Sequence, residues 1–326
     1  MKRIIIILGE PNSVNSEIFF KSINNLKKEK INFIIIGNLS LLKKQAKYLG
    51  YKINISFNIL KTKNIDNKNK NKFIFIDIKY NQNKSFELKH NKSSKFVEKC
   101  FECALYLIKR KISSKLINLP INKSKFTKNK YNGITEYIAS KTNNKNKENM
   151  LLFNENFSVL PLTTHIALKN VYKNISYKKI EQACKNINFF YSRVLKKKKF
   201  KIGILGLNPH NGENGYIGNE EKKIIIPAIN KLKKKYPVYG PISPDTSFLQ
   251  RKIMKIDVLI GHYHDQVLTT FKNTFNFDAI NITIGLPFIR ISPDHGTGSG
   301  IIGKNIANPK SFIKAINFLS KYNVQV

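Results

Sequence analysis

Short apolar runs alternate with segments of helical periodicity along most of the chain. The runs are rich in isoleucine and phenylalanine and are bounded by polar or glycine residues, which is typical of buried strands. They cover residues 4–8, 33–36, 73–78, 116–121, 201–205, 256–260 and 280–284. The alternation of strand and helix predicts a layered α/β fold with a mostly parallel sheet.

The segments between these runs place apolar residues three and four positions apart, which predicts amphipathic helices. We expect helices over residues 15–28, 39–49, 94–111, 176–195 and 219–235, and a last helix that begins at Asn308. In residues 94–111, Cys100 and Cys103 fall on the apolar face. They therefore read as core residues of a helix and not as a redox pair. Residues 151–162 form two apolar runs split at 154–156, which predicts a hairpin.

The chain of 326 residues is long enough for two domains or one large α/β unit. No apolar run approaches the length of a membrane span. The basic start is followed by only five apolar residues, too few for a signal peptide. Three cysteines cannot supply a disulfide framework for a chain of this size. We therefore expect a cytoplasmic protein that makes no membrane contact.

The charge is strongly positive, with 58 Lys and Arg against 20 Asp and Glu, a net charge of +38. Such a value normally points to nucleic acid or to an anionic membrane. The lysines, however, are scattered among asparagine and isoleucine, as in residues 61–72 (KTKNIDNKNKNK). A compositional drift towards AT-rich codons produces this pattern without a binding surface. We expect no nucleic-acid partner, although a basic nucleic-acid-binding protein remains the alternative from a different class.

Five of the six histidines fall at predicted strand ends or in the loops that follow: His165, His210, His262, His264 and His295. The carboxyl ends of parallel strands meet at one edge of a sheet, where α/β proteins bind ligands. Imidazoles from separate loops commonly hold a divalent transition metal with one position open for substrate. Carboxylates in the same loops come from Asp245, Asp265 and Asp294, as metal ligands or as partners of the imidazoles.

Basic side chains also follow strand ends, at Lys123, Lys272 and Arg290. They suit a small anionic substrate, and arginine offers the forked geometry for carboxylate or phosphate. Each of them, taken alone, is equally well an ordinary surface charge.

Several longer segments occur together in a fixed order: 208–215 (NPHNGENG), 263–266 (YHDQ), 285–290 (GLPFIR) and 292–297 (SPDHGT). They closely resemble the signature segments of the 4-hydroxythreonine-4-phosphate dehydrogenase family of vitamin B6 biosynthesis. With Gly9-Glu10-Pro11 and Thr163-Thr164-His165, the resemblance covers essentially the whole chain and is strongest from Thr163 onward.

The resemblance implies a subunit of two α/β/α layered domains of the isocitrate and isopropylmalate dehydrogenase type. The absence of a GxGxxG motif agrees with this and not with a Rossmann domain. The resemblance also implies an outer domain of residues 1–125 and 300–326, and a metal-binding and dimerisation domain of residues 126–299. The family also implies a homodimer whose site lies in the cleft between the domains and at the subunit interface.

The site residues that the resemblance implies fall into four groups. The metal ligands are His165, His210 and His264, which the family draws from both subunits. The substrate contacts are Thr135, Lys272, Asn281 and Arg290. The loop that receives the dinucleotide contains Asp294, His295, Gly296, Thr297 and Gly303. The candidate catalytic residues are Asp245, as a carboxylate near the metal or a proton carrier, and Lys272.

The implied reaction is the NAD- or NADP-dependent oxidation of 4-phosphooxy-L-threonine at C3 to 2-amino-3-oxo-4-phosphooxybutanoate. This product decarboxylates to 3-amino-2-oxopropyl phosphate on the way to pyridoxal 5'-phosphate. The implied cofactors are the dinucleotide and a divalent metal, Zn, Mg or Co. The alternative within the same class is a metal- and NAD-dependent dehydrogenase of another phosphorylated or acidic hydroxy acid.

The chain departs from the family pattern at four places. Ile134 replaces the histidine that usually precedes the substrate-binding threonine, and it cannot donate to a phosphate or carboxylate. Residues 12–16 (NSVNS) replace a glycine-rich turn with a proline. Val267 replaces a glycine, and residues 298–300 (GSG) replace a more apolar run. We expect an intact metal site and an altered substrate pocket.

Overall fold

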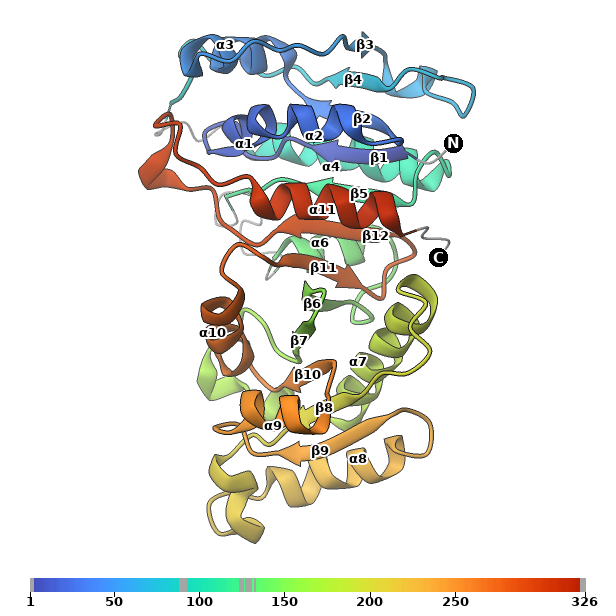
Figure 1. Ribbon diagram of the computed structural model, residues 1–326, viewed down its shortest axis with the longest axis vertical. Helices are drawn as coiled ribbons and strands as arrows, with labels where there is room; N and C mark the ends of the chain where they lie inside the picture. Colours follow the sequence, from blue (N-terminus) through green and yellow to red (C-terminus); the bar gives the residue numbers. More distant parts are fainter. Residues whose placement is uncertain (1–2, 88–92, 123–125, 127–130, 132, 323–326) are drawn as a thin grey trace. The chain divides into compact units, whose positions relative to one another are not determined.

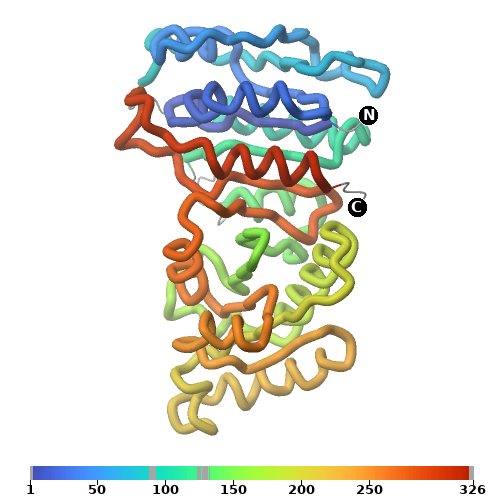
Figure 2. The backbone as a smooth tube through the Cα atoms, in the orientation of Figure 1, coloured from blue at the N-terminus to red at the C-terminus, as the bar shows by residue number. Residues whose placement is uncertain are grey.

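The computed structural model describes residues 3–87, 93–122, 126, 131 and 133–322. Its internal contacts divide the chain into two compact units. Unit 1 comprises Met1–Ile134 and Pro287–Val326, and unit 2 comprises Thr135–Leu286. Figure 2 shows the C-terminal segment, in red, returning to the N-terminal part of the chain, in blue, within unit 1. Each unit has its own set of strands and covering helices.

Unit 1 has parallel strands in the order β3 (Asn58–Ile59), β4 (Phe73–Asp77), β2 (Asn32–Gly37), β1 (Arg3–Ile7), β5 (Lys115–Asn118) and β12 (Ile289–Pro293). Its helices are α1 (Asn15–Lys21), α2 (Ile23–Lys28), α3 (Leu39–Leu49), α4 (Ser93–Lys109) and α11 (Lys310–Lys321), with short 3-10 turns η1 (Thr62–Asn64) and η7 (Ser299–Ile301). Figure 1 shows α1, α2 and α11 on one face of β1, β5 and β12 and α4 on the other. Because both faces are covered, every residue of β1 is buried.

Unit 2 has strands in the order β11 (Ile280–Ile284), β6 (Asn149–Asn154), β7 (Phe157–Pro161), β10 (Val258–Gly261), β8 (Ile202–Leu205) and β9 (Val238–Ile242). The first three pair antiparallel, and the last four are parallel neighbours. The helices are α6 (Ile134–Lys141), α7 (Tyr177–Phe189), α8 (Ile226–Leu232), α9 (Ser247–Met254) and α10 (His264–Phe275). Shorter helical turns are η2 (Leu168–Asn170), η3 (Tyr172–Asn174), η4 (Phe190–Val194), η5 (Pro209–Gly215) and η6 (Glu221–Ile225).

The predicted elements are found, with differences at several ends. The hairpin forms where it was expected, with Asn154 paired to Phe157 across the turn. The predicted helix over 15–28 is broken at Ser22, whose hydroxyl donates to Ile18 O at 2.8 Å and competes with the helical bonding pattern. The predicted helix over 219–235 begins as a wider π-helical turn at Glu221 and ends its α-helical part at Leu232.

The two cysteines of the predicted pair lie inside α4, as expected. Cys100 is 1% exposed and Cys103 is 8% exposed, and burial raises the pKa of both thiols. They are therefore protonated packing residues and not a redox centre. Among the described residues, no helix is both long and apolar enough to cross a membrane.

The lysine- and asparagine-rich segment 61–72 is anchored to unit 1 more firmly than a solvated loop. Arg3, only 2% exposed, donates to Asp66 O at 2.6 Å and also to Asn69 O. Arg110 donates to Ile65 O at 3.3 Å from the other side. A buried guanidinium needs such acceptors because an unsatisfied one is costly. Two arginines therefore hold the backbone of a segment whose side chains are mostly polar.

Candidate functional site

Four loops of unit 2 carry the predicted metal ligands and the carboxylates Asp245 and Asp265, whereas the third predicted carboxylate, Asp294, lies in unit 1. The four loops follow the neighbouring parallel strands β7, β10, β8 and β9, so they emerge at one edge of the sheet. We call this edge the unit 2 rim and define it as residues 162–165, 262–266, 206–218 and 243–245. It carries His165, His264, His210 and Asp245, in that order of strands.

Hydrogen bonds below the surface tie these loops together. Thr163 Oγ1 donates to His262 O at 2.7 Å, which joins the loops after β7 and β10. Gln266 joins the loops after β10 and β8, because its Nε2 donates to Gly206 O at 2.8 Å and its Oε1 accepts from His262 N at 2.6 Å. The rim is therefore a connected framework and not a set of separate loops.

His165 and His264 face each other across this framework. Their ring centroids are 5.9 Å apart. His264 Nδ1 lies 2.8 Å from Asp265 Oδ1. When Nδ1 donates to that carboxylate, Nε2 carries the lone pair that a metal requires. Two imidazoles at this separation, one of them oriented by a carboxylate, fit the donor set of a divalent transition metal.

His210 stands in a loop of unusual backbone. Residues 210–214 all adopt left-handed conformations, with φ between 42° and 77°. For residues other than glycine this conformation costs about 1–2 kcal/mol each, less for asparagine. Such strain persists only where the surroundings hold the backbone in place, and it is common at functional sites.

Glu221 supplies much of that hold. It is 2% exposed, and its Oε1 accepts from Leu207 N and from Asn208 N, both at 2.7 Å. Its Oε2 accepts from Asn208 Nδ2 at 2.9 Å. The sequence suggests that Glu221 is an acid in the first turn of a helix, where it complements the helix dipole. The structure instead turns it back onto the loop that carries His210, and no local signal distinguishes the two roles.

Asp245 lies at the exposed end of the rim. Ser243 Oγ donates to its Oδ1 at 2.7 Å. This hydrogen bond lowers the pKa of Asp245, and the nearby His210 lowers it further. Asp245 is therefore ionised near neutral pH and suits the role of a charged partner better than that of a proton donor.

His262 does not group with the predicted metal ligands. It is fully buried, with Nε2 2.7 Å from Leu205 O. Burial lowers its pKa to about 4, so it stays neutral and structural. His295 lies in unit 1, half-buried, with Nδ1 2.9 Å from Gly296 O. Lys123 and the sixth histidine, His90, lie outside the described residues.

The predicted substrate residues of unit 2 lie on three different elements. Thr135 is the second residue of α6, and the next residue, Glu136, accepts from Thr164 Oγ1 at 3.3 Å and so joins α6 to the loop that carries His165. Lys272 is exposed on α10, eight residues or about 12 Å along the helix from His264. Asn281 lies on β11, and its Oδ1 is buried with no hydrogen-bond partner in the described part of the chain.

Unit 1 contains the remaining predicted residues. Arg290 on β12 is 4% exposed, and its Nε donates to Asn118 Oδ1 at 2.6 Å, which fixes the guanidinium plane. The segment 294–303 follows β12 and contains the predicted dinucleotide residues Asp294, His295, Gly296, Thr297 and Gly303. A side chain at Gly296 or Gly300 would meet no atom within 4 Å, so the backbone there is open to a close ligand.

The departures from the family pattern are accommodated locally. Ile134 is a core residue, 5% exposed. Val267 is fully buried against Gly261, where a Cβ would stand 2.5 Å from Val267 Cγ1. In the turn over residues 12–16, Asn15 Nδ2 donates to Leu8 O at 2.9 Å and to Pro120 O at 2.7 Å. Polar side chains therefore hold a turn that glycine and proline shape in the family.

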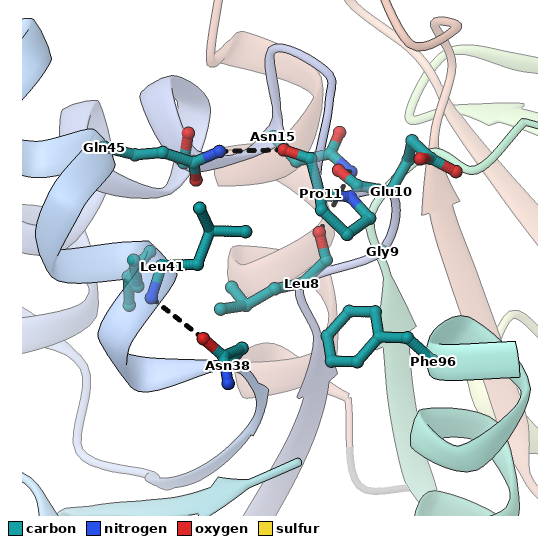
Figure 3. A pocket seen from close by; sticks show the side chains of 11 residues that line it. Leu8, Gly9, Glu10, Pro11, Asn15, Asn38, Leu41, Gln45 and Phe96 are labelled. Atoms are coloured by element: carbon teal, nitrogen blue, oxygen red, sulfur yellow. Dashed lines mark hydrogen bonds between the residues drawn. The ribbon is translucent and has the colours of Figure 1, made fainter. Parts of the chain in front are cut away.

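A pocket of unit 1 lies beside this turn, at the carboxyl ends of β1 and β2 (Figure 3). Leu8, Leu41 and Phe96 make its apolar wall, and Gln45 closes it by donating to Pro11 O at 2.8 Å. None of the predicted site residues lines it. Asn15 Nδ2, Asn38 Oδ1 and Gln45 Nε2 in its lining make internal hydrogen bonds, so the pocket supports the turn and does not form the candidate site.

No group of three His, Cys, Asp or Glu side chains that could hold a metal occurs within the described part of this single chain. Two of the three predicted ligands lie together, and His210 stands near Asp245 on the same rim. A site completed by a second subunit stays a prediction.

Comparison with known proteins agrees with these observations. The sequence model of the family described as pyridoxal phosphate biosynthetic protein PdxA matches residues 29–319. A relative from Sulfurihydrogenibium sp. (strain YO3AOP1), named 4-hydroxythreonine-4-phosphate dehydrogenase, is 38% identical over 97% of both chains. A Salmonella typhimurium relative named D-threonate 4-phosphate dehydrogenase is 31% identical, again over 97% of both.

The structure of a putative 4-hydroxythreonine-4-phosphate dehydrogenase from Salmonella typhimurium is 30% identical to this chain. It aligns with a TM-score of 0.82 and covers 98% of this chain and 99% of its own. This likeness confirms the predicted α/β fold class. The chain belongs to the PdxA family of pyridoxal phosphate biosynthetic proteins.

Proposed function

We propose that this chain oxidises 4-phosphooxy-L-threonine at C3 with NAD or NADP as hydride acceptor, and that a divalent metal assists. The resulting β-keto acid, 2-amino-3-oxo-4-phosphooxybutanoate, loses carbon dioxide to give 3-amino-2-oxopropyl phosphate. The observation that carries the proposal is the 38% identity, over 97% of both chains, to a relative named for this activity. The paired imidazoles of the rim and the open backbone at Gly296 and Gly300 support the proposal.

His165, His210 and His264 would hold the metal, with His264 supplied by the partner subunit. Imidazole donors favour Zn²⁺ or Co²⁺ over Mg²⁺, which prefers oxygen ligands. A divalent ion bound there lowers the pKa of a substrate hydroxyl and polarises a carbonyl. Asp265 would hold the His264 ring in its binding orientation through Nδ1, and Asp245 would add negative charge at the rim.

Lys272 and Arg290 would bind the anionic ends of the substrate. Arg290 is suited to a phosphate or carboxylate because Asn118 Oδ1 accepts from its Nε and fixes the guanidinium plane. Thr135 would add a hydroxyl donor at the start of α6. The buried Asn281 Oδ1 would accept from the substrate ammonium or hydroxyl group.

The segment from Asp294 to Gly303 would receive the dinucleotide, which supplies the hydride acceptor. Its backbone is open at Gly296 and Gly300. A homodimer is also part of this proposal. On α9, Leu249 is 63% exposed and Ile253, one turn later, is 74% exposed, an apolar stripe that a second subunit could cover.

The proposal is tested by following NADH at 340 nm with 4-phosphooxy-L-threonine and the Zn²⁺-loaded protein. We expect NADH formation that a chelator abolishes, that added Zn²⁺ or Co²⁺ restores, and that His264→Ala lacks. A control, His262→Gln, keeps the metal ligands intact. A metal-loaded wild type that binds NAD but forms no NADH with this substrate would contradict the proposed reaction.

D-threonate 4-phosphate is the second candidate substrate, because a relative of 97% coverage is named for it. The two substrates differ at C2, which carries an ammonium group in the first and a hydroxyl group in the second. A kcat/KM for 4-phosphooxy-L-threonine that exceeds the kcat/KM for D-threonate 4-phosphate supports the proposed assignment. A kcat/KM for 4-phosphooxy-L-threonine well below that for D-threonate 4-phosphate assigns this chain to threonate oxidation instead.

A further inference from the structure

Helix α1 contacts the segment that follows the predicted dinucleotide loop. Glu17 on α1 is 1% exposed, and its Oε1 accepts from Ala307 N at 2.5 Å. The same oxygen accepts from Lys21 Nζ, one helical turn later, at 2.8 Å. A buried carboxylate thus bonds directly to backbone that lies 290 residues away along the chain.

Lys21 completes this contact. Its Nζ also donates to Asn305 O at 3.0 Å and to Ala307 O at 2.9 Å. An ammonium group has three donors, and all three are used here. Tyr51 adds a further bond, from its hydroxyl to Asn305 Oδ1 at 2.6 Å. Asn305 has a left-handed φ of 58°, so the backbone that these groups hold is a strained turn.

The same helix is joined to the other end of the segment. Val14, which directly precedes α1, donates its N–H to Thr297 O at 3.1 Å. A Cβ at Gly298 would stand 2.7 Å from Val14 Cγ1, so the Val14 side chain packs directly against the backbone of Gly298. We call Val14, Glu17 and Lys21 the α1 clamp. It contacts residues 297–298 and 305–307, the two ends of the segment 297–307.

A buried ion pair contributes little net stability compared with apolar residues of the same size, because both charges lose their water. A pair whose ammonium group uses all three donors, and whose carboxylate Oε1 accepts two hydrogen bonds, does however favour one backbone arrangement over others. We propose that Glu17 and Lys21 are positioning residues that hold the segment 297–307 in its dinucleotide-binding conformation. This inference rests on the proposed function, since it assumes that the segment binds NAD.

The proposal predicts a specific defect in Lys21→Met. The variant loses both bonds to the backbone of residues 305 and 307 and leaves Glu17 buried without its cation. If the segment takes its binding conformation only about a tenth of the time, its apparent affinity for NADH is about tenfold weaker. We therefore expect the Kd for NADH to rise about tenfold. Glu17→Gln keeps an acceptor for Ala307 N and should show a smaller rise. Lys21→Arg keeps the charge and the donors and should bind NADH nearly as the wild type does.

Three measurements on the full-length protein test this. Fluorescence titration with NADH in the absence of substrate gives the Kd. Hydrogen exchange of the 297–307 amides reports the segment itself, and steady-state kinetics separate KM for NAD from kcat. In Lys21→Met we expect faster exchange of the amide hydrogen of residue 307 and a KM for NAD raised about tenfold. We expect kcat at saturating NAD, and KM for the phosphorylated substrate, to stay within about twofold of the wild type. Lys28→Met, the same change at an exposed lysine on α2, is the matched control.

Unchanged NADH affinity in Lys21→Met, beside a wild type that binds NADH, would overturn the clamp and leave the proposed function standing. An equal loss in Lys28→Met would overturn it too, because the effect would then be one of net charge. A wild type that binds no NADH would contradict the proposed cofactor, and the positioning role with it. Faster exchange together with a raised Kd, and recovery in Lys21→Arg, would support the clamp.

Discussion

Replacing Glu221 by glutamine tests how the strained loop that carries His210 is held. The carboxylate accepts three hydrogen bonds inside the protein, from the backbone of Leu207 and Asn208 and from the Asn208 side chain. Glutamine has nearly the same shape but only one acceptor atom. Its Oε1 can keep the two backbone bonds, whereas its amide nitrogen then faces Asn208 Nδ2, donor against donor.

The magnitude follows from these three contacts. A hydrogen bond to a charged group contributes about 1.5–3 kcal/mol, and one between neutral groups about 0.5–1.5 kcal/mol. The two backbone bonds thus weaken by about 1 kcal/mol each, and the third is lost at a cost of about 1 kcal/mol or more. We expect Glu221→Gln to lower the free energy of unfolding by about 3 kcal/mol, unless the loop alone relaxes.

Denaturant unfolding measures this loss, and Zn²⁺ titration reports whether the loop alone has relaxed. Glu213→Gln is the matched control. Glu213 lies in the strained loop itself, with a left-handed φ, but its side chain is exposed. We expect the control to stay within about 0.5 kcal/mol of wild type. If Glu221→Gln matched the control in both stability and Zn²⁺ affinity, the carboxylate would not be what holds the loop.

Three further predictions concern other parts of the two units. The pKa of His262 falls from 6.5 to about 4 on folding, so between these pH values the unfolded chain binds one more proton than the folded chain. The free energy of unfolding is therefore at its full value above pH 6.5 and falls by about 3 kcal/mol towards pH 4. Denaturation at a series of pH values should show this slope in the wild type and not in His262→Phe. Gly261→Ala should lose about 1–3 kcal/mol through its clash with Val267, and Val267→Ala in the same chain should recover part of that loss in a double-mutant cycle. Asn118→Ala should release the Arg290 guanidinium and raise KM for the phosphorylated substrate several-fold with a smaller change in kcat; an equal loss with Asn122→Ala would argue against that orientation role.

The fold could be predicted from the sequence wherever a short-range pattern decides it. Strand β1 is five consecutive apolar or buried positions, and α4 shows the helical spacing that buries Cys100 and Cys103. The break at Ser22 could not be predicted, because the apolar spacing continues across it and the competing hydroxyl bond depends on the folded backbone.

The candidate site could be predicted in outline for a similar reason. Parallel strands bring their carboxyl ends to one edge, so the loops that carry His165 and His264 were expected to lie together, and their rings do. The roles of Glu221, Gln266 and His262 could not be read from the sequence, because each depends on partners in another loop. His262 in particular has the same sequence context as the predicted ligand His264, and only burial separates them.

The account depends most on the metal that the unit 2 rim is proposed to bind. The direct measurement is Zn²⁺ stoichiometry and affinity by calorimetry on the purified wild type and on His165→Ala, His210→Ala and His264→Ala, with His262→Gln as the control. We predict one ion per chain in the wild type and the control, and a large loss of affinity in each of the three variants. A wild type that binds no Zn²⁺ or Co²⁺, or three variants that bind it as the wild type does, would contradict the account.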